Sequence, residues 1–183
     1  VQFLMKKNKI EVINGFGKVK PGKSVEVTAA DGSKKTYTAA HIILATGARS
    51  RELPNLKQDG KNIIGYREAM SLPEQPKSMV VVGSGAIGVE FAYFYNAMGT
   101  KVTVVEFMPN IVPVEDEEVS KQLERSLKKV GIEIMTNSSV ESVTVSGGTC
   151  SVKIKSAKGE SVITCEKVLS AVGITTNIEN IGL

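Results

Sequence analysis

The chain has 183 residues, which is enough for one domain, or for one domain and part of another. The formal net charge is only +4, and the lysines and arginines are dispersed, which gives little reason to expect nucleic-acid binding. No apolar stretch approaches the roughly 18–20 residues of a membrane span. No signal or transit peptide is recognisable at the N-terminus. The composition therefore indicates a globular protein that binds neither nucleic acid nor membrane.

The N-terminal forty residues contain short elements, several of them with strand character. Residues 1–7 predict the tail of a helix, and the apolar residues 10–13 predict a short strand. Residues 24–28 and 34–38 alternate apolar and polar side chains around Ala30-Asp31-Gly32. An Asp-Gly pair between two alternating runs is a strong signal for a β-hairpin.

A second apolar run, residues 42–45, ends in Ala-Thr-Gly and predicts a buried strand. The single histidine, His41, precedes this run, and we interpret it as a strand-edge residue rather than a catalytic base. Residues 48–78 contain three prolines and show no sustained period. This pattern predicts a linker with at most one short helix, near residues 67–72.

The most informative stretch begins with the apolar run 79–82, which is typical of a parallel strand buried on both faces. Gly83, Gly85 and Gly88 follow this run in G-x-G-x-x-G spacing. In that pattern the first glycine permits a tight turn and the second lets a pyrophosphate approach the backbone. The third glycine lets the following helix pack closely. The spacing therefore predicts a dinucleotide-binding turn; the alternative is a Rossmann-like domain that keeps the turn for packing alone.

A helix is predicted to begin near Ala86 and to end before Gly99, which suits a C-terminal cap. Four large apolar residues recur at helical spacing, which places them on one face of this helix. These residues are Ile87, Phe91, Phe94 and Met98.

A second strand, residues 101–105, ends on Glu106, which follows Gly88 by 18 residues. A carboxylate at roughly this distance from the glycine turn accepts hydrogen bonds from the ribose hydroxyls of the cofactor. The same carboxylate would repel a 2′-phosphate, and no arginine immediately follows Glu106. We therefore predict a preference for NAD(H) over NADP(H).

A further helix is predicted over residues 115–130, followed by a third parallel strand at 132–135. The apolar face of this helix is expected to consist of Val119, Leu123, Leu127 and Val130. The acidic residues 116–118 could suggest a metal site, but we interpret them as the first turn of the helix, where acidic side chains are favoured. We expect no metal.

The alternation then changes to that of a β-meander over residues 140–145, 150–155 and 161–164, and an apolar strand at 168–172 closes the unit. Cys150 and Cys165 both lie in this region. We interpret them as buried small residues; a redox pair is the alternative, although no C-x-x-C motif surrounds them.

Five segments of the chain carry a family resemblance, and together they cover nearly its full length in the family's order. The chain resembles the pyridine nucleotide–disulfide oxidoreductases, and among them the dihydrolipoamide dehydrogenases. The segments are INGFGKV (13–19), IILATGARSRELP (42–54), VVVGSGAIGVEFA (80–92), VTVVEFMPNIVP (102–113) and LSAVGITTN (169–177).

The resemblance implies the fold and the domain organisation. The expected fold class is α/β: a Rossmann-like parallel sheet with helices and a β-meander, as in the FAD/NAD(P)-binding fold, with flanking strands. Residues 77–173 would form the NAD-binding domain. Residues 1–76 would belong to the C-terminal part of an FAD-binding domain, and residues 174–183 would form the return linker to it.

The resemblance also implies two sets of cofactor contacts. Those for NAD fall on Gly83, Ser84, Gly85, Ala86, Ile87, Gly88, Val89, Glu90, Glu106, Val140 and Gly173. Those for FAD fall on Gly17, Thr46, Gly47 and Ala48. The role of Glu90 depends on the resemblance alone, since its position in the sequence indicates an exposed helix residue.

The expected function of the parent enzyme is to oxidise dihydrolipoyl groups of 2-oxo-acid dehydrogenase complexes and to pass hydride through FAD to NAD⁺. Its expected partners are the dihydrolipoyl domain and a second copy of itself in a homodimer. Its expected location is the cytoplasm, or the mitochondrial matrix in a eukaryote. The alternatives are another flavin–disulfide reductase, such as an NADH oxidase or mercuric reductase, and an NAD-binding module without chemistry.

Some parts of the family pattern are missing from this sequence. It lacks the N-terminal FAD-binding glycine motif, the Cys-x-x-x-x-Cys redox disulfide and the C-terminal domain with its catalytic histidine. We therefore expect an excised NAD-binding domain with strands of the FAD domain attached, and no catalytic residue within the chain.

Overall fold

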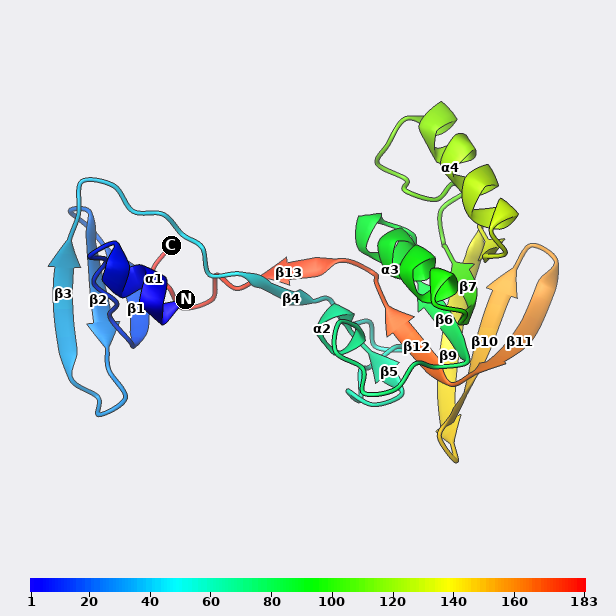
Figure 1. Cartoon of the computed structure of the whole chain (residues 1–183), viewed down its shortest axis with the longest axis horizontal. Coiled ribbons are helices and arrows are strands. Elements are labelled where there is room, and N and C mark those ends of the chain that lie inside the picture. The colour runs from blue at the N-terminus through cyan, green and yellow to red at the C-terminus, as the bar shows by residue number, and fades with distance from the viewer. The chain divides into compact units, whose positions relative to one another are not determined.

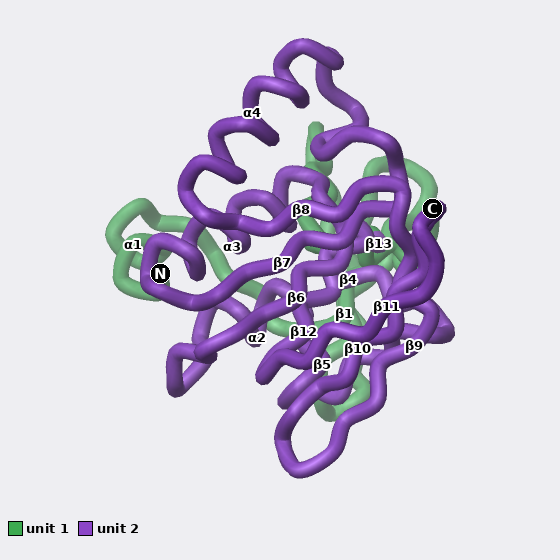
Figure 2. The backbone as a smooth tube through the Cα atoms, turned by 90° about the vertical axis from the view of Figure 1, so that its right-hand side faces the viewer, with its two compact units in different colours: residues 1–48, 176–183 green, residues 49–175 purple.

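A computed structural model describes residues 1–183, which form two compact units. Residues 1–48 and 176–183 make up unit 1, and residues 49–175 make up unit 2, as coloured in Figure 2. The sequence had suggested divisions after residues 76 and 173. Residues 49–76 instead group with unit 2, because Leu56 and Ile64 from this segment are fully buried in its two cores.

Unit 1 consists mainly of a three-stranded antiparallel sheet in the order β1-β2-β3. Its elements are α1 (Gln2–Lys7), β1 (Phe16–Lys20), β2 (Ser24–Thr28) and β3 (Lys34–Thr38). The hairpin predicted around Asp31 is confirmed, and Asp31 Oδ1 accepts a hydrogen bond from the Ser33 N–H at 2.9 Å inside the turn. The helix expected within residues 1–7 is also confirmed.

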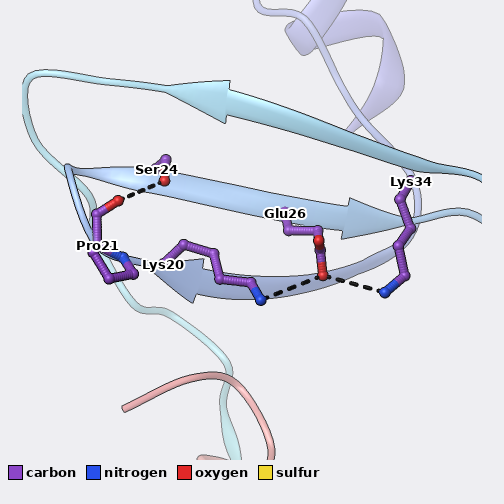
Figure 3. Close-up of polar contacts among 5 residues, drawn as sticks. All are labelled: Lys20, Pro21, Ser24, Glu26 and Lys34. Carbon is purple, nitrogen blue, oxygen red and sulfur yellow. Dashed lines mark hydrogen bonds and ion pairs between the residues drawn. The ribbon is translucent and has the colours of Figure 1, made fainter.

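An acidic side chain on the central strand of this sheet joins the two outer strands. Glu26 lies between Lys20 of β1 and Lys34 of β3, at 3.7 Å and 3.5 Å from their ammonium nitrogens (Figure 3). Both lysines stand diagonally across the ladder from Glu26, which is within the reach of long side chains. At the start of β2 the Ser24 hydroxyl donates to the Pro21 carbonyl at 2.9 Å.

Two strands predicted from apolar runs do not form. Residues 10–13 and 42–45 have no strand assignment, and Ile43 is 90% exposed. A strand needs a neighbour that satisfies its backbone N–H and C=O groups, and neither run has one. Apolar composition alone was therefore a wrong guide for these two runs.

Unit 2 contains a five-stranded sheet in the order β5-β12-β6-β7-β8, with every neighbouring pair parallel. The strands are β5 (Ile63–Ile64), β6 (Ser78–Val82), β7 (Lys101–Val105), β8 (Glu133–Met135) and β12 (Lys167–Ser170). The strands expected near residues 79–82, 101–105, 132–135 and 168–172 are thus confirmed. The edge strand β5 was not predicted, because it lies in the segment interpreted as a linker.

The loop before β5 is held by one carboxylate. Asp59 Oδ1 accepts hydrogen bonds from the backbone N–H groups of Lys61, Asn62 and Ile63 at 2.7–2.9 Å. Partial burial disfavours the charged carboxylate, but these donors outweigh it, so the pKa of Asp59 lies below its ordinary value of 3.8. The loop presents the Asn62 carbonyl to the Val168 N–H at 2.8 Å, which attaches β5 to β12.

The helices of unit 2 are α2 (Tyr66–Ala69), α3 (Ala86–Ala97) and α4 (Glu117–Lys129). The apolar face expected on α3 is only partly buried: Phe91 packs against the core, whereas Phe94 and Met98 are more than half exposed. The buried residues of the helix are Gly88, Val89, Ala92 and Tyr95. Large apolar residues occur on several sides of α3 itself, so their spacing alone did not identify the side that packs against the sheet. The close packing of Gly88 determines that face instead, as described below.

Helix α4 begins as the acidic cluster suggested. Asp116 is its N-cap, and its carboxylate accepts a hydrogen bond from the Glu118 N–H at 2.8 Å. Leu127 is buried, whereas Val119 and Val130 are at least half exposed, so only part of the expected apolar face is used.

The antiparallel meander is confirmed, with β9 (Ser138–Ser146), β10 (Thr149–Ser156) and β11 (Gly159–Cys165) in the order β11-β10-β9. Alternate residues of β6 join different cores. Met79 and Val81 pack with residues of α3, and Val80 and Val82 pack with residues of the meander. The parallel sheet is therefore covered by helices on one face and by the meander on the other, which is why β6 is apolar throughout.

The chain passes between the units on two short strands. These are β4 (Ala48–Ser50) and β13 (Ile174–Thr176), which pair with each other and run side by side in Figure 1.

We expect Asp59→Asn to lower the free energy of unfolding at pH 7 by about 1 kcal/mol, a modest value because this carboxylate is exposed to solvent. Since the pKa of Asp59 is depressed by folding, its contribution is present above pH 3.8 and is lost as the pH falls through the folded pKa. Urea unfolding of the variant and the wild type, followed by circular dichroism at pH 7 and pH 3, should show a difference that shrinks in acid. Glu74→Gln, an exposed charge change in the loop before β6, is the control. An equal loss at both pH values would contradict the assignment.

Candidate dinucleotide-binding site

A cavity of about 620 Å³ lies at the carboxyl edge of the parallel sheet. The carboxyl ends of β6, β7 and β12 contribute to it, as does the start of β9. The strand order reverses at β6, since β7 and β8 lie on one side and β12 and β5 on the other. A reversal of this kind opens a crevice beyond the strand ends, where parallel α/β sheets bind their ligands.

Two of the three motif glycines are required by the fold itself. Gly83 has a φ of +97°, and an added Cβ would lie 2.5 Å from the Ala171 carbonyl oxygen. At Gly88 an added Cβ would lie 2.0 Å from the Gly83 carbonyl oxygen. Any side chain at either position would therefore displace the start of α3 or the end of β12.

Gly85 differs from its two neighbours in the motif. It has a φ of −64° and a ψ of −179°, which any residue adopts, and no atom lies within 4 Å of the position of an added Cβ. It lines the cavity, so the missing side chain leaves space on the ligand side. Neither backbone conformation nor packing within the protein explains a glycine here.

The N-terminus of α3 supplies hydrogen-bond donors at this point. Gly85 is the N-cap, and the Val89 N–H donates to the Gly85 carbonyl at 3.1 Å. The amides of the first turn that precede Val89 have no acceptor within the helix, and the helix dipole gives this end partial positive charge. Such an end attracts phosphate groups.

Glu106 stands beside the glycine turn, directly after β7, and is only 7% exposed. Its Oε2 accepts hydrogen bonds from both the N–H and the hydroxyl of Ser84, each at 2.7 Å. Its Oε1 accepts one from the Met108 N–H at 2.8 Å. The carboxylate is therefore held in one orientation at the wall of the cavity.

The structure brings together six of the eleven residues predicted to contact NAD. Those that line the cavity are Gly83, Ser84, Gly85, Glu106, Val140 and Gly173. The remaining five, residues 86–90, form the first turns of α3 behind the glycine turn. Glu90 is exposed and borders a separate shallow hollow with Phe91 and Phe94.

The four residues predicted to contact FAD all lie in unit 1. Gly17 belongs to β1, Thr46 and Gly47 lead into β4, and Ala48 is the first residue of β4. The chain here is fixed by Asn177, whose N–H donates to the Gly47 carbonyl at 3.0 Å and whose amide nitrogen donates to the Thr46 carbonyl at 3.2 Å. Their role toward FAD stays a prediction.

Several cavity residues were not predicted from the sequence. Arg51 and Asn55 come from the loop after β4, and the Asn55 amide nitrogen donates to the Val140 carbonyl at 2.6 Å, which ties this loop to β9. Phe107 and Met108 follow Glu106 directly and belong to the same wall. Proximity to Glu106 could have indicated the last two, but no sequence signal places the loop residues.

Cys150 and Cys165 are directly opposed on β10 and β11, and both are buried in the core behind the cavity. Burial raises the pKa of the Cys165 thiol to about 12, and the neighbouring Cys150 adds to this effect. The interpretation of both residues as buried small residues agrees with the structure, in which both are free cysteines in the core. The sequence did not show that they face each other.

The structure contains neither a cluster of metal-ligating side chains nor a helix that could span a membrane. No group of three or more His, Cys, Asp or Glu residues is arranged to hold a metal ion. None of the helices combines the length and the apolar character that crossing a bilayer requires.

We expect a thiol reagent such as Ellman's reagent to leave both cysteines unmodified in the native protein at pH 8, and to label two thiols after denaturation.

Because folding raises the pKa of Cys165 above its ordinary value of 9.0, its contribution to stability is complete below pH 9 and is lost as the pH rises toward 12. The loss should approach about 1.4 kcal/mol per pH unit in this range. Chemical unfolding of the wild type and Cys165→Ala from pH 8 to pH 11 checks the slope; equal slopes would contradict the assignment.

Comparisons with known proteins bear on this site and on the whole chain. The sequence model of the family described as "Pyridine nucleotide-disulphide oxidoreductase" matches residues 1–183. The dihydrolipoyl dehydrogenase of Rhizobium etli is 45% identical over 201 residues, which cover all of this chain. That of Chlorobaculum parvum is 45% identical over 184 residues, again over the whole chain.

Solved structures show the same fold. The crystal structure of LpdA from Mycobacterium tuberculosis has a TM-score of 0.83 at 30% identity, over 99% of this chain and 40% of LpdA. A ferredoxin reductase from Rhodopseudomonas palustris has a TM-score of 0.79 at 26% identity, over 98% of this chain and 45% of that protein. The expected α/β fold is thereby confirmed. The chain spans 41% of the Rhizobium protein and 39% of the Chlorobaculum protein.

Proposed function

Because the chain belongs to the pyridine nucleotide–disulphide oxidoreductase family, we propose that unit 2 binds NAD(H) in the cavity at the carboxyl edge of its parallel sheet. The cofactor's pyrophosphate would lie over Gly85 against the first-turn amides of α3. The adenine ribose would lie at Glu106. The volume of about 620 Å³ is in the range of small-molecule sites.

The observation that carries this proposal is the open space at Gly85. The fold explains Gly83 and Gly88 through close contacts, but a side chain at Gly85 would meet no protein atom within 4 Å. The alternative, a turn kept only for packing, accounts for two glycines and leaves the third without a reason. A ligand that approaches the backbone at Gly85 supplies that reason.

The charge at Glu106 favours NAD(H) over NADP(H). The carboxylate is nearly buried and lies next to the N-terminus of α3, where the ribose would follow the pyrophosphate. Ribose hydroxyls donate hydrogen bonds to a carboxylate, whereas the dianionic 2′-phosphate is repelled by it. No cation follows Glu106, since Phe107 and Met108 come next.

For the whole protein we propose the activity of a dihydrolipoamide dehydrogenase, on the strength of relatives of that name that are 39–45% identical over the full chain. FAD and NAD would supply the redox chemistry, with hydride passing to NAD⁺. The residues of this chain would orient the nicotinamide cofactor and exclude water from it. Catalytic groups and the redox disulfide would come from outside these 183 residues.

The proposed partners of the whole protein are the dihydrolipoyl domain of a 2-oxo-acid dehydrogenase complex and a second copy of the protein in a homodimer. The proposed location is the cytoplasm, or the mitochondrial matrix in a eukaryote. Another flavin–disulfide reductase is the second candidate, because the family model that matches residues 1–183 is that of the pyridine nucleotide-disulphide oxidoreductases in general.

We expect Gly85→Ala to leave the thermal unfolding midpoint within about 2 °C of the wild type and to weaken NADH binding about tenfold or more, because the new methyl group occupies the ligand side of the turn. Gly88→Ala should instead lower the midpoint strongly, because its Cβ collides with the Gly83 carbonyl. Calorimetric titration with NADH and a thermal melt separate the two effects. Unchanged NADH affinity in a folded Gly85→Ala protein would contradict the proposal.

We expect the wild type to bind NADH more tightly than NADPH. In Glu106→Gln we expect the ratio of the NADPH dissociation constant to the NADH dissociation constant to fall about tenfold. The amide keeps hydrogen-bonding capacity for the ribose but no longer repels the phosphate. Parallel fluorescence titrations with both nucleotides give the ratio directly. Tighter binding of NADPH by the wild type would contradict the assigned role of Glu106.

A further inference from the structure

We propose that Ser84 is a positioning residue: its hydroxyl fixes the orientation of the Glu106 carboxylate, so that Ser84 contributes to the choice of NAD(H) over NADP(H). This inference rests on the proposed function of the cavity. Both residues contribute to the cavity wall, and Ser84 is completely buried.

The contacts of the carboxylate leave it little freedom. A carboxylate has about four lone-pair positions for hydrogen bonds. The Ser84 N–H and hydroxyl take two of these on Oε2, and the Met108 N–H takes one on Oε1. Oε2 is therefore saturated, and the position that remains for a ligand is on Oε1.

A ribose hydroxyl would donate to the remaining position on Glu106 Oε1. Ser84 Oγ does not meet the ligand itself, because Ser84 is completely buried; it donates its proton to Glu106 Oε2. The Ser84 hydroxyl thus fixes which carboxylate oxygen faces the ribose.

The same arrangement acts against a 2′-phosphate. A phosphate dianion has no proton to donate to Glu106 Oε1. It would also face a carboxylate that three donors prevent from rotating away. Loss of the Ser84 hydroxyl removes one of these restraints, so the carboxylate can turn and the repulsion weakens.

The local fold depends on the backbone of Ser84 rather than on its hydroxyl. The backbone of Ser84 is held independently, because its N–H donates to Glu106 and its carbonyl accepts from the Val112 N–H at 2.9 Å. The hydroxyl contacts only Glu106. A purely structural role would therefore appear in stability and not in the choice of nucleotide.

The experiment measures the dissociation constants of NADH and NADPH for Ser84→Ala, Glu106→Gln and the double variant. We expect Ser84→Ala to reduce the NADPH/NADH ratio of these constants about fivefold, and to have no further effect on the ratio in the Glu106→Gln background. Ser120→Ala is the matched control: Ser120 is also buried, but its hydroxyl donates to the Val112 carbonyl at 3.4 Å outside the cavity, so the ratio should not change. Ser84→Gly removes the same hydroxyl and should reproduce the effect if Ser84→Ala does not fold.

Three outcomes would overturn the inference. If both Ser84 variants fold and keep the wild-type ratio, the hydroxyl is structural only. If Ser84→Ala changes the ratio equally with and without Glu106, the serine acts on the ligand directly. If the wild type binds neither nucleotide, the proposed function fails, and the inference fails with it.

Discussion

Helix α3 approaches the end of β6 so closely that an added Cβ on Gly88 would lie 2.0 Å from the Gly83 carbonyl oxygen. This contact fixes how α3 starts and which of its sides meets the sheet. The buried side consequently carries Gly88, Val89 and Ala92 rather than the larger Phe94. It also places Gly85, the N-cap of α3, at the wall of the cavity, so the packing constraint and the proposed phosphate site have one origin.

Strand β6 contributes side chains to both layers of unit 2. Its odd-numbered residues Met79 and Val81 pack among the helices, and its even-numbered residues Val80 and Val82 pack against the meander. The cavity lies where these layers end, so the meander contributes Val140 to a site whose glycine turn belongs to the helix layer. A change of register in β6 would exchange these two sets of side chains.

The parts of the fold that the sequence predicted depend on residues close together in the chain. The strand, glycine turn and helix around Gly83, and the hairpin at Asp31, are of this kind, as is Glu106 at the end of the next strand. The failures concern pairing between distant residues. Residues 42–45 have strand composition but no neighbouring strand, whereas the two residues of β5 gain one from β12 over a hundred positions later. Arg51 and Asn55 reach the cavity through the same kind of distant packing.

The insertion of unit 2 between the two segments of unit 1 has a consequence for synthesis on the ribosome. Residues 49–175 are continuous, so their sheet can close as soon as β12 emerges. Residues 1–48 emerge first, yet Val19 and Gly47 must wait for Ile181 and Asn177 to provide their backbone partners. The part of the chain that is made earliest is therefore completed last, and its exposed apolar side chains need protection from aggregation during that interval.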